Sequence, residues 1–349
     1  MRVADLYLTG IGSDLGALTP VAAPLAAGEF SRDDAVRTGQ LSTAVAELSG
    51  PELAVRAGRK ALRQARDLTG EPVWPTLCLH AGIYHSGVDF WHAGSYVRDQ
   101  LGLGAGPGLT LELGAMSNSV VAGLDIAASV LRGRPDHDTA LITAGDRFGG
   151  RGFPHWGTDI GIVYGDAGSA LVLSKRPGLA RIRAIASYTD PSLEGLQRGD
   201  EPFRQASIAG HRGLDIRRRK RQWLARHGGA AAVDTRNAAA VSSVVKTALA
   251  DAGVDLPDIA KICAPHYGRR LLETQVLRPL GVPEQRTMTE LGLRVGHLGA
   301  SDQVVALEHL LRHGEAGPAD HVLLLGIGVG MTWTAVILQL GPEPAGCWD

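Results

Sequence analysis

A serine, two histidines and an aspartate stand where their side chains could carry acyl transfer. Ser117 lies in the segment AMSNS, where a short apolar run turns into a helical pattern. His297 and Asp302 lie five positions apart, at the entry to another helical pattern. A serine hydroxyl becomes a useful nucleophile only when a base lies within hydrogen-bond reach and a third group holds that base. These three residues could supply such a set, although a serine or aspartate at a helix start can also be a plain cap.

The elements that must position these residues alternate along the chain. Short apolar runs bounded by Gly, Pro or Asp are each followed or preceded by a helical pattern, which predicts an α/β protein with helices covering sheets. In the helix after Ser117 the apolar stripe is Val120, Leu124, Ala127 and Leu131. The expected strands are 77–84, 139–146, 169–174, 259–265 and 321–328, and the expected helices are 52–66, 118–132, 237–252, 269–278 and 301–313.

Two distant segments share one plan. Residues 52–82 and 238–268 each contain an amphipathic helix, a Gly and Pro connection, a buried strand and a loop with His and Gly. This similarity indicates an internal duplication of about 170 to 190 residues. We therefore expect two halves, 1–175 and 176–349, that share one core.

Composition limits the class of protein. The 349 residues are 44% apolar and 20% charged with a net charge of −1, so nothing favours binding to nucleic acid or to an anionic membrane. No apolar run is long enough for a membrane span, and the N-terminus lacks a secretion pattern. The three cysteines, Cys78, Cys263 and Cys347, are too scattered for a disulfide framework or a zinc site. A reducing, cytoplasmic setting without a metal or cofactor is expected.

Four further segments, in order, resemble the β-ketoacyl synthase III family of the thiolase-like fold. They are YGDAGSALVL (164–173), APHYGRR (264–270), VGHLGASDQVVAL (295–307) and LLLGIGVGMTW (323–333). The resemblance covers nearly the whole chain. It implies duplicated βαβαβ halves that form a layered αβαβα core.

The resemblance also assigns roles. It places Ser117 where the family has its nucleophilic cysteine, with Ser119 as the alternative, while a one-residue slip to Met116 would leave no nucleophile. His266 falls on the family's catalytic histidine and His297 falls where the family has asparagine. A base-assisted serine then needs Asp302 to orient His297. Cys78 and Cys263 are expected in the core and Cys347 in the tail, so none of them can replace the missing thiol.

The pair Ser117–Asn118 is similar to a branch of starter-unit synthases in aromatic polyketide pathways, of the daunorubicin type. That resemblance implies that a short acyl group, propionyl in particular, passes from acyl-CoA to Ser117 and is condensed with malonyl on an acyl carrier protein after decarboxylation. Backbone N–H groups of Ser117 and Val329 would form the oxyanion hole. The alternative is an acyltransferase that moves the acyl group to an alcohol or a carrier protein without forming a C–C bond. A non-catalytic partner subunit is disfavoured, because the serine, both histidines and the aspartate are all present.

Weaker features suggest how substrates bind. By resemblance Arg37 and Thr38 lie near CoA, Trp156 could stack on adenine, and Arg269 stands where the family has a pantetheine-facing asparagine, leaving room for a phosphate contact. Segment 85–109 lies in the region of the family's dimer contact, which implies a homodimer. The basic run 216–227 is either a solvated helix face or a docking surface for an acidic carrier protein. The docking candidates are Arg217, Arg218, Arg219, Lys220 and Arg221.

Overall fold

The computed structural model describes residues 1–150, 152–203 and 214–342. Within these residues nine strands form one sheet, in the order β5-β4-β6-β7-β1-β8-β11-β10-β9. The strands are β1 (Tyr7–Leu15), β4 (Leu77–Ala81), β5 (Leu109–Leu113), β6 (Thr139–Asp146), β7 (Ala167–Ser174), β8 (Ala180–Thr189), β9 (Ile259–Cys263), β10 (His321–Gly328) and β11 (Thr332–Leu340). A separate hairpin pairs β2 (Ala17–Pro20) with β3 (Ser42–Val45).

The two halves of the sheet repeat one topology. The order β4-β6-β7-β1 in the first half corresponds to β9-β10-β11-β8 in the second. In each half the first pair is parallel and the other two pairs are antiparallel. Within the sheet the two halves meet where β1 pairs with β8, through Tyr7↔Arg181 and Leu8↔Ala180. The plan shared by 52–82 and 238–268 thus appears as a helix followed by a strand at equivalent places in both halves.

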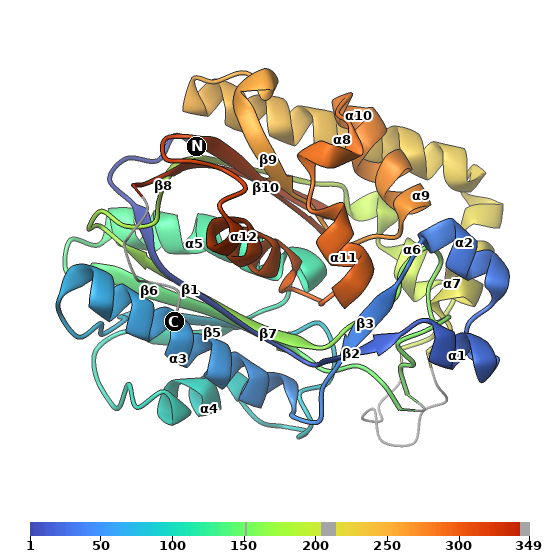
Figure 1. Cartoon of the computed structure of the whole chain (residues 1–349), viewed down its shortest axis with the longest axis horizontal. Coiled ribbons are helices and arrows are strands. Elements are labelled where there is room, and N and C mark those ends of the chain that lie inside the picture. Colours follow the sequence, from blue (N-terminus) through green and yellow to red (C-terminus); the bar gives the residue numbers. More distant parts are fainter. Residues whose placement is uncertain (151, 204–213, 343–349) are drawn as a thin grey trace.

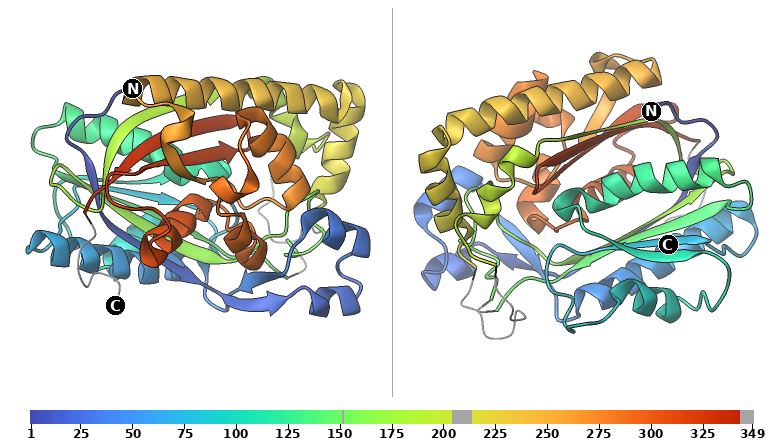
Figure 2. Two further views of the ribbon diagram at one scale, coloured as in Figure 1. Left: turned by 45° about the horizontal axis from the view of Figure 1, so that its top comes forward. Right: turned by 180° about the vertical axis from the view of Figure 1, so that it is seen from behind.

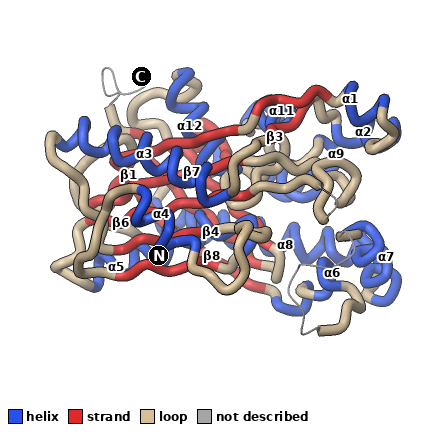
Figure 3. Tube along the Cα trace, turned by 90° about the horizontal axis from the view of Figure 1, so that it is seen from below, coloured by secondary structure: helices blue, strands red, loops and turns tan. Residues whose placement is uncertain are grey.

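Helices form three layers around the two half-sheets (Figures 1 and 2). α3 (Gly50–Thr69) and α4 (Ala93–Gln100) cover the outer face of the first half, as the view from below shows (Figure 3). α8 (Gly229–Ala252) covers the outer face of the second half. α5 (Ser119–Gly133) and α12 (Asp302–His313) run between the half-sheets and contact strands of both. The predicted αβαβα layering is confirmed.

The remaining helices are short or lie at the ends of the layers. Among the helices of the described chain, none combines the length and apolar character that a membrane span needs. The predicted helix 269–278 is interrupted by a π-helical turn at Glu273–Leu277. The remaining α-helices are α1 (Ala22–Ala26), α2 (Arg32–Thr38), α6 (Gly195–Arg198), α7 (Ile216–Arg226), α9 (Arg269–Leu272), α10 (Arg278–Leu280) and α11 (Thr289–Val295). The 3₁₀ turns are η1 (Met116–Asn118), η2 (Pro191–Leu193), η3 (Leu256–Asp258) and η5 (Glu284–Arg286).

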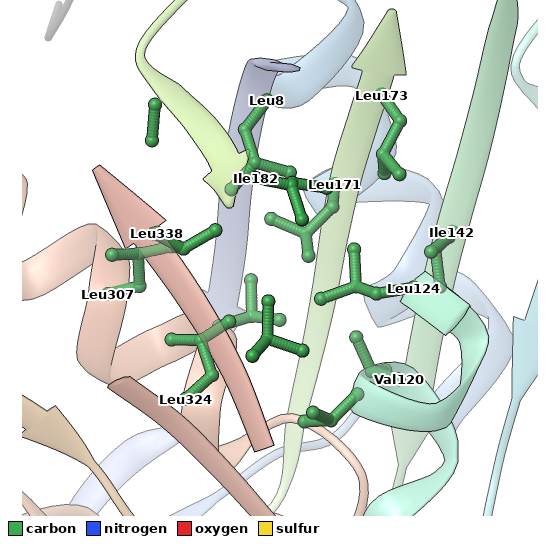
Figure 4. Packing of buried hydrophobic residues seen from close by; sticks show 14 of the residues in the cluster. Leu8, Val120, Leu124, Ile142, Leu171, Leu173, Ile182, Leu307, Leu324 and Leu338 are labelled. Carbon is green, nitrogen blue, oxygen red and sulfur yellow. The ribbon is translucent and has the colours of Figure 1, made fainter. Parts of the chain in front are cut away.

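The central core holds the two inner helices in place (Figure 4). Val120 and Leu124 of α5 and Leu307 of α12 are at most 1% exposed and pack against leucine and isoleucine side chains of both half-sheets. Burial of each such side chain contributes about 1.5–3 kcal/mol. The predicted stripe on the helix after Ser117 is confirmed, since Val120, Leu124, Ala127 and Leu131 are all buried.

Candidate active site

The elbow between β5 and α5 presents Ser117. Met116 adopts a left-handed φ of 51°, which turns the chain sharply ahead of the serine. Ser119 closes the turn, because its Oγ accepts a hydrogen bond from the Ala115 backbone N–H (2.9 Å) and donates to the Leu113 carbonyl (3.4 Å). Ser119 is completely buried and committed to the backbone, so it is not available as a nucleophile.

Ser117, His297 and Asp302 form a continuous hydrogen-bonded triad. Ser117 Oγ lies 2.9 Å from His297 Nε2, and His297 Nδ1 lies 2.5 Å from Asp302 Oδ2. The three side chains come from distant parts of the chain. Ser117 precedes α5, Asp302 is the first residue of α12, and His297 lies in the loop between α11 and α12. Ser117 is 8% exposed and lies close to the surface, whereas His297 and Asp302 are more deeply buried, at 2% and 0% exposed.

The Asp302 carboxylate organises the loops around both histidines. Its Oδ2 also accepts the His266 backbone N–H (2.8 Å), and its Oδ1 accepts the Leu298 backbone N–H (2.7 Å). These bonds hold an ionised carboxylate in a fully buried place, because charge-assisted hydrogen bonds offset the loss of water. Asp302 is therefore both a helix-start residue and the group that fixes His297.

The charges of the triad favour a base at His297. Burial by itself lowers the pKa of His297, but the charge and hydrogen bond of Asp302 outweigh it, and the net pKa lies above the ordinary value. Burial raises the pKa of Asp302, but the two histidines and their hydrogen bonds bring it below its ordinary value. Because a carboxylate only accepts, His297 Nδ1 carries the proton and the neutral Nε2 accepts the Ser117 hydroxyl proton.

His266 lies against the same carboxylate, beyond β9. Its Nδ1 is 3.2 Å from the Gly296 carbonyl oxygen and 3.3 Å from Asp302 Oδ1. Both neighbours are acceptors, so Nδ1 carries the proton of the neutral ring. Burial lowers the pKa of His266, which keeps the ring neutral. Its buried Nε2 has no hydrogen-bond partner among the described residues and is therefore a free acceptor.

The tip of the β10–β11 hairpin lies against the elbow. A Cβ on Gly328 would lie 2.2 Å from the Ala115 carbonyl oxygen and 2.8 Å from Asn118 Cβ. Val329 follows directly, so the structure brings it beside the backbone of the nucleophile. Its part in an oxyanion hole together with the Ser117 N–H stays a prediction.

Comparison with known proteins places this arrangement in a family. Residues 249–340 match the model of the C-terminal part of 3-oxoacyl-[acyl-carrier-protein] synthase III. The β-ketoacyl-[acyl-carrier-protein] synthase III of Synechocystis sp. is 24% identical over 254 residues, which are 70% of this chain and 72% of the relative. The solved structure of ChlB3, described as an acyltransferase, is 31% identical with a TM-score of 0.89 over 99% of this chain and 100% of its own. The chain belongs to the 3-oxoacyl-(acyl carrier protein) synthase III family.

Solved synthases of this family share the fold at lower identity. The 3-oxoacyl-(acyl carrier protein) synthase III of Pseudomonas aeruginosa PAO1 has a TM-score of 0.77 at 23% identity, over 97% of this chain and 99% of its own. The predicted thiolase-like fold is confirmed. As a member of this family the protein is a transferase, with His266 and His297 inside the matched C-terminal segment.

Two of the residues predicted to contact CoA lie close to the site. Thr38 is buried at the end of α2, and a Cβ on Gly268 would lie 2.7 Å from its Cα and Cβ. Since Gly268 is two positions after His266, this contact brings the end of α2 close to His266. Arg37 is exposed beside it. Their contact with CoA stays a prediction.

The other two expected substrate contacts, at Trp156 and Arg269, also stay predictions, and both side chains have partners within the protein. Trp156 is 8% exposed and packs against Phe30 with ring centroids 5.1 Å apart, so its ring belongs to a small apolar cluster. Arg269 is bonded to Glu284 and, at 2.8 Å, to Glu290, which neutralise the charge that a phosphate would need. Both side chains thus contact other residues of the protein.

The basic run forms helix α7, but most of its charge is compensated. Arg217 pairs with Asp34 (3.0 Å), Arg218 and Arg219 pair with Glu201, and Lys220 pairs with buried Asp159 (2.6 Å). Arg221 is exposed and forms no ion pair with any residue that the structure describes. Within this run, the positive charge that stays available for docking a carrier protein is therefore mainly that of Arg221 and its exposed neighbours.

The two cysteines within the described residues lie outside the site. Cys78 and Cys263 are buried, as predicted, and burial raises the pKa of each thiol. Cys347 lies outside the described residues.

Sequence reasoning missed two carboxylates that support the site. Asp146 ends β6 and accepts backbone N–H groups of Ile83 (2.7 Å), Tyr84 (3.1 Å) and Ala300 (3.3 Å), so it ties the loop after His297 to the first half. Burial raises its pKa to about 6. Its signal in the sequence was a charged residue closing the apolar run TALITAGD, where a carboxylate would otherwise be costly.

The second is Asp159. Its Oδ2 accepts the Tyr164 hydroxyl (3.2 Å) and its Oδ1 pairs with Lys220. The Tyr164 ring lies 5.4 Å from the His297 ring, centroid to centroid, so α7 is linked to His297 through these side chains. No spacing rule connects residues 159, 164 and 220, and the sequence held no usable signal.

Proposed function

We propose that this protein is a serine-dependent acyltransferase that takes a short acyl group from acyl-CoA and passes it to a hydroxyl or to a carrier-protein thiol. The observation that carries the proposal is the orientation of the two imidazole rings. Both hold their proton at Nδ1, facing Asp302, and so both offer an unprotonated Nε2. Two such nitrogens suit removal of a proton from a hydroxyl or thiol. They do not suit donation of a hydrogen bond to an enolate.

In the first half-reaction Ser117 Oγ attacks the thioester carbonyl and its proton passes to His297 Nε2. Backbone N–H groups of Ser117 and Val329 would stabilise the oxyanion, helped by the positive N-terminal end of α5. The tetrahedral intermediate then expels the CoA thiolate, which takes the proton from His297. The products are free CoA and an ester on Ser117.

The second half-reaction reverses these steps with a new acceptor. The acceptor O–H or S–H gives its proton to His297 Nε2 as its oxygen or sulfur attacks the ester. The proton then returns to the Ser117 alkoxide as the acyl product leaves. The free acceptor nitrogen of His266 can receive a hydrogen bond from the incoming hydroxyl or thiol and so orient it.

Decarboxylative condensation is the second candidate. The match of residues 249–340 to the synthase III model and the pair of buried histidines favour it. In this form the enzyme loads propionyl on Ser117 and condenses it with malonyl on an acyl carrier protein, as a starter-unit synthase of an aromatic polyketide pathway. The thioester enolate would then need a protonated Nε2 on His266 or His297.

One experiment separates the two candidates. The protein is incubated with propionyl-CoA, its intact mass is measured, and the adduct is mapped with S117A as control. Separate samples of the acylated protein are then incubated with N-acetylcysteamine, with glycerol and with malonyl-acyl carrier protein. Discharge by the thiol or alcohol supports acyl transfer, whereas CO₂ release with a 3-oxoacyl product supports condensation. Absence of an adduct with any short acyl-CoA would overturn both.

We also propose that the protein is a homodimer. Strand β5 is an edge of the sheet, and its Leu109 and Leu111 are 45% and 42% exposed. The nearby Phe90 is fully exposed. An exposed apolar edge strand is a natural place for pairing with a second copy. Sedimentation equilibrium tests this, and a monomer at micromolar concentration would contradict it.

A further inference from the structure

A chain of polar side chains leads away from the residue that follows the nucleophile. Asn118 is completely buried, and its Nδ2 donates to Thr334 Oγ1 on β11 at 2.9 Å. Thr334 Oγ1 lies 3.1 Å from Ser187 Oγ on β8, and Ser187 Oγ lies 3.2 Å from Asp125 Oδ2. Asp125 is on α5, seven residues after Asn118, so the chain closes a loop around the first two turns of that helix.

The chemistry of the four groups fixes the direction of every bond. Asp125 as a carboxylate only accepts, so Ser187 must use its single proton there. Ser187 Oγ then accepts the Thr334 hydroxyl proton, which leaves Thr334 Oγ1 to accept from the Asn118 amide. All donors thus point from the elbow toward a negative charge, an arrangement in which each bond strengthens the next.

Two glycines of β10 make room for this residue. A Cβ on Gly326 would lie 2.0 Å from Asn118 Oδ1, and one on Gly328 would lie 2.8 Å from Asn118 Cβ. Gly326 is also the register partner of Thr334 in the β10–β11 pair. The Asn118 side chain therefore lies flat across this pair, and only glycine at these two positions allows it to do so.

We propose that Asn118 is a positioning residue for Ser117, which it holds in line with His297 by anchoring the elbow to β11. The inference rests on the proposed function, since it needs Ser117 to be the nucleophile. The elbow contains Met116 in a left-handed conformation, which costs free energy and persists only where its surroundings enforce it. The strained turn belongs to the first half of the chain, and Asn118 links it to β11 of the second half. His297 also belongs to the second half.

The test uses diisopropyl fluorophosphate, because it measures the nucleophilicity of Ser117 without any acyl donor. Ser117 Oγ forms a bond to phosphorus, fluoride leaves and the proton passes to His297. Variants N118A and T334V remove the donor and the acceptor of the anchoring bond. N237A is the matched control, since Asn237 is equally buried and bonds Trp333 (2.9 Å) without touching the elbow.

We expect the labelling rate constant of the folded protein to fall by about 100-fold in N118A, as for a displacement of a reacting group by about 1 Å. A fall of roughly 10-fold is expected in T334V, and the double variant should be no slower than N118A because both changes break one bond. N237A should be labelled at a rate within about twofold of the wild type, even if its melting temperature falls as far as that of N118A. The pH midpoint should stay that of the wild type in N118A, because His297 and Asp302 are untouched.

The outcomes separate the two proposals. If the wild type is not labelled, or S117A is labelled equally, the proposed function fails. If the wild type is labelled at Ser117 and N118A and T334V are labelled at the same rate, Asn118 is not a positioning residue. The same conclusion follows if N237A slows as much as N118A, or if the pH midpoint shifts in N118A.

Discussion

Replacing Asp302 by asparagine should disable the site while leaving its shape nearly unchanged. The amide can take two orientations. If its oxygen faces His297 Nδ1 and the His266 N–H, its NH₂ group meets the Leu298 N–H, which then loses its acceptor. If it is reversed, the NH₂ group faces the His266 N–H and forces His297 into the tautomer with a proton on Nε2. That tautomer cannot accept the Ser117 proton.

Both orientations lower the rate of acylation. The carboxylate in the wild type fixes the tautomer and stabilises the imidazolium that forms, and loss of this function in a serine triad costs roughly 10³–10⁴ in rate. A 10³-fold loss corresponds to about 4 kcal/mol of transition-state stabilisation. The rate constant for acylation of Ser117 by propionyl-CoA, followed by intact mass in a quenched-flow series, measures it directly.

The pH dependence of the residual rate provides a second readout. In the wild type the pKa of His297 lies above its ordinary value of 6.5, so the acylation rate should rise as pH increases through that higher pKa. Without the Asp302 charge, burial dominates and the midpoint in D302N should fall below 6.5. The matched control is D166N, because Asp166 is also buried and bonded to a histidine, His155 (2.9 Å), outside the triad. Acylation by D302N within tenfold of the wild type, or an equal loss in D166N, would refute the assigned role.

Three further outcomes are expected. S117A should form no acyl adduct by mass spectrometry, and an adduct elsewhere would contradict the assigned nucleophile. The ionised Asp302 should raise the free energy of unfolding, measured in urea, above about pH 3.8. The contribution of His297 to that free energy should be lost as pH rises through the raised pKa of its imidazole. K220M should lower the free energy of unfolding by about 3–5 kcal/mol, because it leaves buried Asp159 without its cation, whereas R221A should change it by less than about 0.5 kcal/mol. An equal effect of the last two substitutions in urea titrations would argue against the buried pair.

The main features of the fold could be predicted because they are local patterns. The apolar runs that became β4, β6 and β10 are buried on both faces and form nearly continuous apolar stretches in the sequence. β1 was missed because its sequence, YLTGIGSDL, replaces bulky side chains with glycines. A Cβ on Gly10 would lie 2.1 Å from the Ala61 carbonyl oxygen, so α3 approaches this strand too closely for larger residues.

The four side chains at the centre of the candidate site were also predictable. Ser117, Asp302 and the two histidines follow from spacing and from the resemblance, since each lies at the end of a recognisable strand or helix. The partners that Trp156 and Arg269 have in the structure were not predicted, for a different reason. Both depend on which partners a long side chain finds across the fold, here Phe30 and a pair of glutamates, and no local pattern carries that information.

The placement of the triad across the two repeats has an evolutionary consequence. The N-terminus of α5 is tied to β11 by Asn118 and Thr334, and the N-terminus of α12 is tied to β7 by Ser301 and Ser169 (2.9 Å). Helix starts at equivalent places in the two halves thus carry different parts of the triad. The start of α5 carries Ser117 just ahead of it, and the start of α12 carries Asp302, which is bonded to His297. Under the proposed function neither half alone holds all three groups of the triad, so selection on catalysis would also preserve the union of the two halves.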